Sequence, residues 1–375
     1  MVLPTVFWLD PGQSFTHTFG GTPRRTVTLR SVDVRWEPLV VNGTSYRVFH
    51  EGRVLIDMEG IEHELVCKAY ELPCEIDGLQ IAVDLIREIS GGTVPVNAGG
   101  AVRFSALDST IPWTGDQPLA FPVSDYRWRA HVTRTHTWNG FVQVASADRE
   151  IYYHRGEDFG AIPNRHPVRT MMAGTVEAVP PEAGDGASNA IIVRSGDLVQ
   201  RYAHANTTTI IRGPALPRMV RAGDVLARTG NTWQAHPTPD PHLHLGLSEA
   251  QSGVRVNPYP YVVEAYRTTW PDEPLPVAGG FRFVRAGNTV TLDASRSLPA
   301  GRGGALRYSW LASDGTRTEG PVLTRSYDEP GTWSEVLVCT GEAGREAYDV
   351  AIVRVSPREG AGTGDEPYPG PPFGY

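Results

Sequence analysis

Asp240-Pro-His-Leu-His-Leu-Gly-Leu-Ser248 alternates polar and apolar side chains from its first histidine onward. Because successive side chains of a β-strand point to opposite faces, this alternation predicts a strand with one apolar face. The apolar face would carry Leu243, Leu245 and Leu247, and the opposite face His242, His244 and Gly246. Imidazole is the commonest metal ligand in proteins and a general base near neutral pH. The stretch therefore predicts either half of a metal site or two exposed histidines on a strand.

Two stretches upstream carry side chains that would complete such a site. The motif His154-Arg-Gly-Glu-Asp158 offers a nitrogen and a carboxylate on either side of a glycine, which permits a tight turn. Leu198-Val-Gln-Arg-Tyr-Ala-His204 is predicted to be a short strand with Tyr202 and His204 on one face. A catalytic zinc ion usually takes three protein ligands and leaves a fourth position for water. The three stretches together contain enough ligands for a site of that kind.

The order H-x-G-x-D, Y-x-H and H-x-H along the chain resembles the lysostaphin-type (LytM) zinc endopeptidases. Further stretches that match the pattern of this family are Pro167-Val168 with Met172-Ala-Gly-Thr-Val176, Asn189-Ala-Ile-Ile-Val193, residues 220–231 and Asn257-Pro258. The resemblance implies an antiparallel β catalytic domain that binds Zn²⁺ and hydrolyses peptide bonds in bacterial peptidoglycan.

The same resemblance implies a role for each polar residue of the motifs. The zinc ligands would be His154, Asp158 and His244, and the catalytic histidines that do not bind the metal would be His204 and His242. Zinc would lower the pKa of its bound water to about 7. The two catalytic histidines would share proton transfer and stabilisation of the oxyanion, and Tyr202 would add a hydrogen bond.

Substrate contacts are predicted next to the H-x-H stretch. Residues 232–241 form a longer and more proline-rich segment than the short serine-glycine turn of the family. Because this segment leads directly into the H-x-H strand, it is predicted to lie beside the metal. We expect the substrate-binding residues to be Tyr202, Trp233, His236 and Asn189.

Three other interpretations of the same residues remain. The zinc site would act on another polymer, such as a uronic-acid polysaccharide cleaved by β-elimination, with zinc neutralising the carboxylate. Alternatively, the protein would be a non-catalytic cell-wall-binding protein, although relatives of that kind usually lose ligands that this chain keeps. A purely structural zinc is disfavoured because such sites normally have four protein ligands.

Composition sets limits on partners and location. The 375 residues are 40% hydrophobic with a net charge of −8, and no apolar run approaches the ~20 residues of a membrane span. The acidic balance, without a basic cluster, argues against nucleic acid as a partner. No signal peptide is visible at Met1. We expect an extracellular or periplasmic protein whose signal peptide has been removed, and the sequence leaves its oligomeric state open.

A mainly β, multi-domain architecture is predicted from 40 glycines, 31 prolines and few helical patterns. The expected parts are an N-terminal β domain of unknown role (1–138), the LytM-like domain (139–270), a β-sandwich (277–357) and a Gly/Pro-rich tail (358–375). The sandwich follows a proline-rich linker and resembles a polycystic-kidney-disease-type (PKD) module, which implies a spacer or substrate-contacting role. This resemblance rests on Tyr308-Ser-Trp310 and Tyr327-Asp-Glu-Pro-Gly-Thr-Trp333.

Cysteine usage is sparse. Cys67 and Cys74 are candidates for a disulfide between neighbouring strands, and the sequence alone leaves that pairing undecided, whereas Cys339 is expected to be free.

Overall fold

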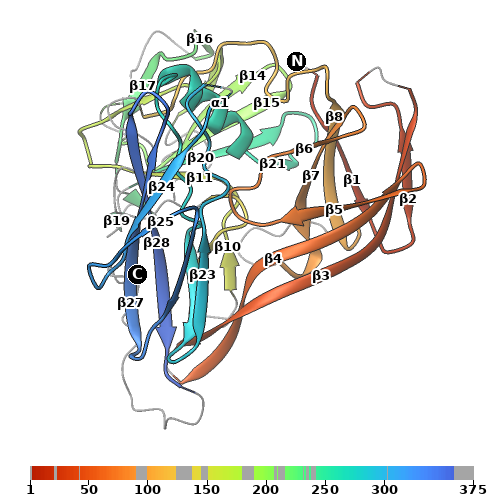
Figure 1. Ribbon diagram of the computed structural model, residues 1–375. Helices are drawn as coiled ribbons and strands as arrows, with labels where there is room; N and C mark the ends of the chain where they lie inside the picture. Colours follow the sequence, from red (N-terminus) through yellow and green to blue (C-terminus); the bar gives the residue numbers. More distant parts are fainter. Residues whose placement is uncertain are drawn as a thin grey trace.

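The computed structural model describes residues 2–20, 23–41, 43–89, 99–123, 137–144, 151–179, 190–206, 209, 216–230, 232–233, 236–237, 242–301 and 303–358. Nearly all of its regular structure is β-strand, which confirms the mainly β, multi-domain prediction (Figure 1). In the described part of the chain, no helix is both long enough and apolar enough to cross a membrane.

The N-terminal region contains two four-stranded antiparallel sheets. One has the order β1-β8-β7-β6, built from β1 (Thr5–Leu9), β6 (Cys74–Ile76), β7 (Leu79–Ile86) and β8 (Val102–Asp108), with the 3₁₀ turn η1 (Arg87–Ile89) after β7. The other has the order β2-β3-β4-β5, built from β2 (Ser14–His17), β3 (Arg25–Val41), β4 (Thr44–Met58) and β5 (Ile61–Cys67). Strands β3 and β4 form a long hairpin that leaves the core of this region and reaches the C-terminal sandwich (Figure 1).

The central region is organised by one antiparallel sheet. Its order is β11-β20-β15-β14-β13-β16, built from β11 (Glu157–Gly160), β13 (Gly174–Ala178), β14 (Ile191–Ser195), β15 (Leu198–Ala203), β16 (Arg218–Val220) and β20 (His242–Glu249), with β21 (Arg255–Val256) paired to β20. Three strand pairs flank it: β9 (Phe141–Val144) with β10 (Ile151–Tyr153), β12 (Pro167–Arg169) with β17 (Val225–Arg228), and β18 (Thr232–Trp233) with β19 (His236–Pro237).

One helix, α1 (Tyr259–Thr269), follows this sheet, and the sequence interpretation missed it. A proline occupies its first turn, where the missing N–H costs nothing. The residues Tyr259, Val262, Val263 and Tyr266 are buried at the i, i+3, i+4 and i+7 spacing of an amphipathic helix. That spacing was the available signal for the helix.

The C-terminal region is a two-sheet sandwich. Its larger sheet has the order β22-β28-β27-β24-β25, built from β22 (Phe281–Arg285), β24 (Arg307–Leu311), β25 (Arg317–Glu319), β27 (Gly331–Thr340) and β28 (Glu346–Ser356). The smaller sheet pairs β23 (Thr289–Asp293) with β26 (Val322–Ser326). Trp310 is fully buried in the hydrophobic core between these two sheets. The tail beyond 358 lies outside the described residues.

The apolar core of the central sheet extends across the expected boundary at residue 138. Leu107, Trp113 and Phe121 belong to the same buried cluster as Leu243 and Leu245 of β20. The Phe121 ring meets the Phe159 ring edge to face, with centroids 5.2 Å apart. The N-terminal region and the central sheet therefore share a hydrophobic core.

All three cysteines are free thiols. Cys67 is buried at the end of β5, and Cys74 is exposed at the start of β6, where its thiol donates to the carbonyl of Ile81 at 3.5 Å. The candidate disulfide between Cys67 and Cys74 is therefore not formed.

Candidate metal centre

Strand β20 carries the H-x-H motif as the sequence predicted. Leu243, Leu245 and Leu247 are at most 1% exposed and face the core, so the two histidines lie on the opposite face. In the register with β11, His244 lies directly opposite Asp158, and His242 lies opposite Gly160. Strand pairing therefore places a carboxylate beside His244 and a glycine, which has no side chain, beside His242.

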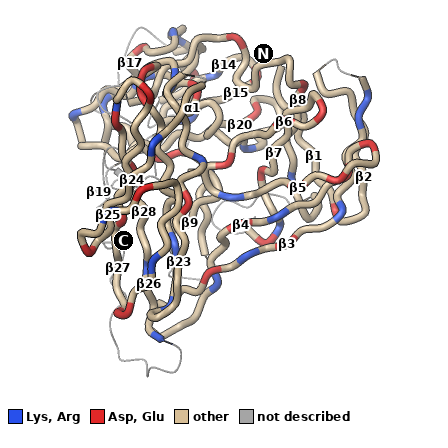
Figure 2. Tube along the Cα trace, in the orientation of Figure 1, with Lys and Arg blue, Asp and Glu red and all other residues tan. Residues whose placement is uncertain are grey.

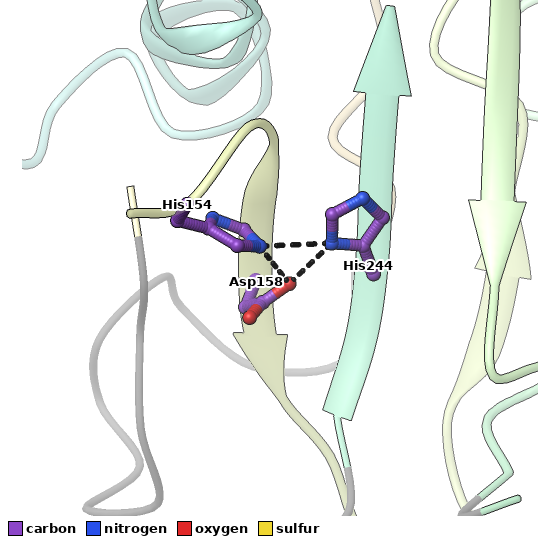
Figure 3. A group of neighbouring side chains, drawn as sticks. All are labelled: His154, Asp158 and His244. Carbon is purple, nitrogen blue, oxygen red and sulfur yellow. Dashed lines mark hydrogen bonds and ion pairs between the residues drawn. The ribbon is translucent and has the colours of Figure 1, made fainter. Parts of the chain in front are cut away.

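His154 enters from the turn between β10 and β11 and completes a cluster of three (Figure 3). Its Nε2 lies 3.0 Å from Nδ1 of His244 and 3.2 Å from Oδ1 of Asp158. The distance between Nδ1 of His244 and Oδ1 of Asp158 is 2.8 Å. Three potential ligand atoms from two strands and a turn thus converge on one point.

This cluster suits a tetrahedral zinc ion. Ligand atoms about 2.0–2.1 Å from zinc lie about 3.3 Å apart in tetrahedral geometry, close to the three distances observed here. Burial lowers the pKa of His244 to about 4, against an opposing effect of Asp158, so the imidazole is neutral near pH 7. A neutral imidazole is the form that binds a metal. The donor set of two imidazoles and one carboxylate therefore fits Zn²⁺.

His204 and His242 lie next to the cluster and outside it. Their ring centroids are 4.5 Å apart, and the centroid of His204 is 6.3 Å from that of His244. Nε2 of His242 is 3.8 Å from Oδ2 of Asp158. His204 is buried, whereas His242 is partly exposed. The structure thus brings together all five polar residues predicted for metal binding and catalysis.

Comparisons with known proteins agree with this arrangement. Residues 152–258 match the model of peptidase family M23, and residues 271–355 match that of the PKD domain. This chain contains an M23 peptidase domain. A PKD domain follows it. A search of curated proteins gave no match.

Two solved structures show similarity to the chain. Csd3 from Helicobacter pylori is 14% identical with a TM-score of 0.31, and the match covers 64% of this chain and 50% of Csd3. The antimicrobial peptidase lysostaphin from Staphylococcus simulans is 14% identical with a TM-score of 0.30, and the match covers 61% of this chain and 91% of lysostaphin. The chain thus spans about half the length of the Csd3 structure.

Tyr202 is placed differently from its prediction. It is fully buried among the core residues of the M23 domain, and its hydroxyl accepts from the backbone N–H of Met171 and donates to Gln200, both at 2.5 Å. Strand β15 ends at Ala203, and His204 has a φ of 63°, in the left-handed region. Within β15, Tyr202 pairs with Leu245 and, like it, points into the core. The turn then breaks the alternation of faces, so that His204 does not follow Tyr202 into the core. Its predicted contact with the substrate is therefore corrected.

The other predicted substrate contacts have no described side chains. Asn189 lies outside the described residues. Trp233 and His236 are described as backbone only, paired with each other in the short β18–β19 hairpin. Their contact with the substrate stays a prediction.

The turn that carries His154 is held by residues that the sequence interpretation did not use. A Cβ atom at Gly156 would lie 2.7 Å from Nε2 of His244, so only glycine leaves room for that ring. Arg155 is buried and donates to Oδ1 of Asn139 at 3.0 Å and to the carbonyl of His154 at 2.9 Å. The carboxylate of Glu157 accepts from Thr137 and points away from the metal ligands.

The N-terminal region anchors this support. The backbone carbonyl of Asp84, on β7, accepts from Nε1 of Trp138 at 2.9 Å and from Nδ2 of Asn139 at 2.8 Å. The Asp84 carboxylate pairs with Arg103 at 3.2 Å, and both side chains are almost fully buried. A buried polar network of this kind fixes ligand orientation from outside the metal site. No local sequence pattern signals it, because its members come from distant strands.

Proposed function

We propose that this chain is a zinc-dependent endopeptidase that hydrolyses peptide bonds in bacterial peptidoglycan. The observation that carries the proposal is the convergence of His154, Asp158 and His244 within an M23 peptidase domain, with two further histidines beside them. The M23 match supports peptidase chemistry. The resemblance to lysostaphin-type enzymes supports peptidoglycan as the polymer, and such a substrate implies a location outside the cytoplasmic membrane.

The chain would hold zinc through Nε2 of His154, Oδ1 of Asp158 and Nδ1 of His244. When bound, zinc supplies Lewis-acid chemistry, which polarises a carbonyl group and makes water acidic enough to react near neutral pH. The protein keeps these ligands in place through the β11–β20 pairing and through the network around Arg155. Preorganised ligands avoid rearrangement during the reaction.

His204 and His242 are the groups available for proton transfer. The carboxylate of Glu157, next to Asp158 in the sequence, accepts from Thr137 and from the backbone N–H of Trp138 at 3.1 Å. Among the described residues, no acidic side chain except Asp158 belongs to the cluster. We therefore assign proton transfer and oxyanion stabilisation to the imidazoles of His204 and His242.

The test of the substrate is product mass spectrometry. The full chain is incubated with purified peptidoglycan and, separately, with a panel of acidic polysaccharides. Newly released amino and carboxyl termini in peptidoglycan fragments are the expected result. Unsaturated uronic-acid products with intact peptidoglycan would instead make the enzyme a polysaccharide lyase.

The test of the site separates its ligands from its catalytic histidines. His244→Ala should lose zinc and activity together. His204→Ala should keep about one zinc per chain and lose turnover by roughly 10²–10⁴-fold, the usual contribution of a general acid or base. Elemental analysis measures the zinc, and His63→Ala, in β5 far along the chain from these motifs, is the matched histidine control. Equal loss of zinc from the His204 and His244 variants would contradict the division of roles.

A further inference from the structure

A cleft of about 470 Å³ lies where three parts of the chain meet. One wall is the β3–β4 hairpin, another is the β22–β23 part of the PKD domain, and the third is the segment around Asn139 and Gly140. This cleft is separate from the metal centre, because none of the five site residues lines it. Its size is within the range of pockets that bind small molecules.

Basic side chains outnumber acidic ones in the lining, five to three. Two of the five are committed to structural pairs: Arg282 holds Glu37 at 2.6 Å, and Arg296 holds Glu71 at 2.5 Å. Figure 2 shows the acidic and basic residues interspersed along β3 and β4. The other three basic groups are not held in this way.

Lys68, Arg35 and Arg53 surround the single carboxylate of Glu51. Their nitrogen atoms lie 3.8, 3.8 and 3.5 Å from its oxygens, which is beyond ordinary hydrogen-bond distance for ion pairs. None of the three makes a side-chain hydrogen bond to another described residue. Glu51 and Asp293 are the two acidic groups of the described lining that remain for these three cations, so the cleft carries an excess of positive charge.

Lys68 has the most buried side chain of these three basic residues. Its side chain is only 17% exposed, and it lines the cleft. An ammonium group has three donors, and burying them without acceptors is costly. Burial and then the charge of Arg296 lower the pKa of Lys68, against the opposing charges of Glu51, Glu71 and Asp293.

The pKa of His50 is also affected by the basic residues of the cleft. Burial and then the charges of Arg282 and Lys68 lower the pKa of His50 to about 3. The histidine is therefore neutral near pH 7, although two carboxylates lie 3.7 and 3.9 Å from its ring nitrogens. Trp36 adds a flat apolar surface to the same cleft, and such rings stack on sugars.

We propose that this cleft is a second binding site, which holds a carboxylate of the polymer substrate through Lys68, Arg35 and Arg53. The inference rests on the proposed function for the identity of the polymer, whose stem peptides carry free carboxylates. The cleft also adjoins the metal centre through backbone: Asn139 N–H donates to the His154 carbonyl at 3.1 Å, and His154 N–H donates to Gly140 at 2.8 Å. A polymer held in the cleft would thus lie against Asn139 and Gly140, whose backbone is hydrogen-bonded to that of His154, a proposed zinc ligand.

The experiment is calorimetric titration of the full chain with three probes. These are a soluble disaccharide tetrapeptide with free carboxylates, the same muropeptide with its carboxylates amidated, and inorganic phosphate. Lys68→Gln should weaken binding of the free-carboxylate probe roughly 10-fold or more, because charge-assisted hydrogen bonds are lost. The amidated probe should bind the wild type and the variant equally weakly.

Further variants separate binding from folding. Arg35 is 64% exposed at the rim, so Arg35→Gln tests the cleft without disturbing packing, and Lys68→Arg should restore binding in part. Arg30→Gln is the matched control, since Arg30 lies on the same strand, β3, but pairs with Asp57 at 3.1 Å away from the cleft. Its affinity should equal that of the wild type.

Two outcomes would overturn the inference. Unchanged affinity in both Lys68→Gln and Arg35→Gln would show that the muropeptide does not bind through these cations. Phosphate binding as tight as that of the free-carboxylate probe would show a general anion site. Either outcome leaves the zinc-site variants of the proposed function untouched, so failure of one proposal is distinguishable from failure of the other.

Discussion

The M23 domain meets its two neighbours in different ways. Towards the N-terminal region it shares an apolar core, in which Leu107 and Trp113 pack with the leucines of β20, and a buried polar network that reaches the turn of His154. The PKD domain has a separate core between its two sheets, and it contacts the β3–β4 hairpin through Arg282 and Glu37. At its edge, Phe283 joins the N-terminal core and Val277 joins the core of the central sheet. The N-terminal region thus shares an extensive core with the M23 domain, whereas the PKD domain adds a few edge residues to it.

The largest expected difference between the two interfaces is in how removal of each neighbour affects folding. A chain that ends at Trp270 should fold cooperatively and cleave soluble substrate, because it keeps most of the shared core and loses Leu275 and Val277 from it. A fragment of residues 139–270 should fail to fold, because the missing N-terminal residues leave β20 and α1 uncovered. Thermal unfolding followed by circular dichroism measures both. A fragment of residues 139–270 with a cooperative transition would show that the shared core is dispensable.

A smaller effect is expected when one buried ion pair is broken in the N-terminal region or at the PKD domain. Arg103→Met leaves the buried Asp84 carboxylate without its cation, and burial already raises the pKa of Asp84. The free energy of unfolding should fall by about 3–5 kcal/mol, as for other buried pairs that lose one partner. Because Asp84 also holds Trp138 and Asn139, zinc affinity should fall as well, by roughly 10–100-fold.

Arg282→Met is the matched change on the PKD side. It removes the partner of Glu37 at the hairpin, and it should lower stability without changing zinc affinity. Urea denaturation and competition with a chelator give the two quantities. Equal loss of zinc affinity in both variants would show that the two interfaces support the metal site to the same extent.

A pH dependence is expected at the PKD-side cleft. The pKa of His50 is about 3 in the folded chain and about 6.5 when unfolded, so the folded state excludes a proton that the unfolded state binds. Stability from neutral His50 is complete above pH 6.5 and is lost as the pH falls towards 3, by about 1.4 kcal/mol per pH unit. His50→Gln should remove this slope. Unfolding free energies of the wild type and variant from pH 7 to 4 measure the difference, and parallel curves would contradict it.

Sequence patterns predicted the features that depend on neighbouring residues. The alternation in β20 placed Leu245 in the core and His244 on the opposite face, and the motif around Gly156 placed His154 near Asp158. The resemblance to a known family then assigned the metal. These features repeat at short spacing, so the local backbone determines them.

Features that depend on distant contacts or on a single backbone angle were not predictable in the same way. Tyr202 was expected to face the substrate, but the positive φ of His204 reverses the side-chain direction after β15. Arg155 and Asp84 are ordinary charged residues in the sequence, and only the packing of β7 against the turn of His154 gives them a role. The shared core likewise joins residues on both sides of position 138.

The β3–β4 hairpin has a mechanical consequence. Its 17-residue and 15-residue strands would span about 50 Å if fully extended, at about 3.3 Å per residue. One end is fixed in the N-terminal core through Val27 and Leu29, and Glu37 near the other end is clamped to the PKD domain. Paired strands resist stretching along their length, and this hairpin is interrupted by bulges between Leu29 and Ser31 and between Arg35 and Trp36. Tension applied to the PKD domain by an attached polymer would therefore be transmitted to the N-terminal core, in which β7, the strand of Asp84, also packs.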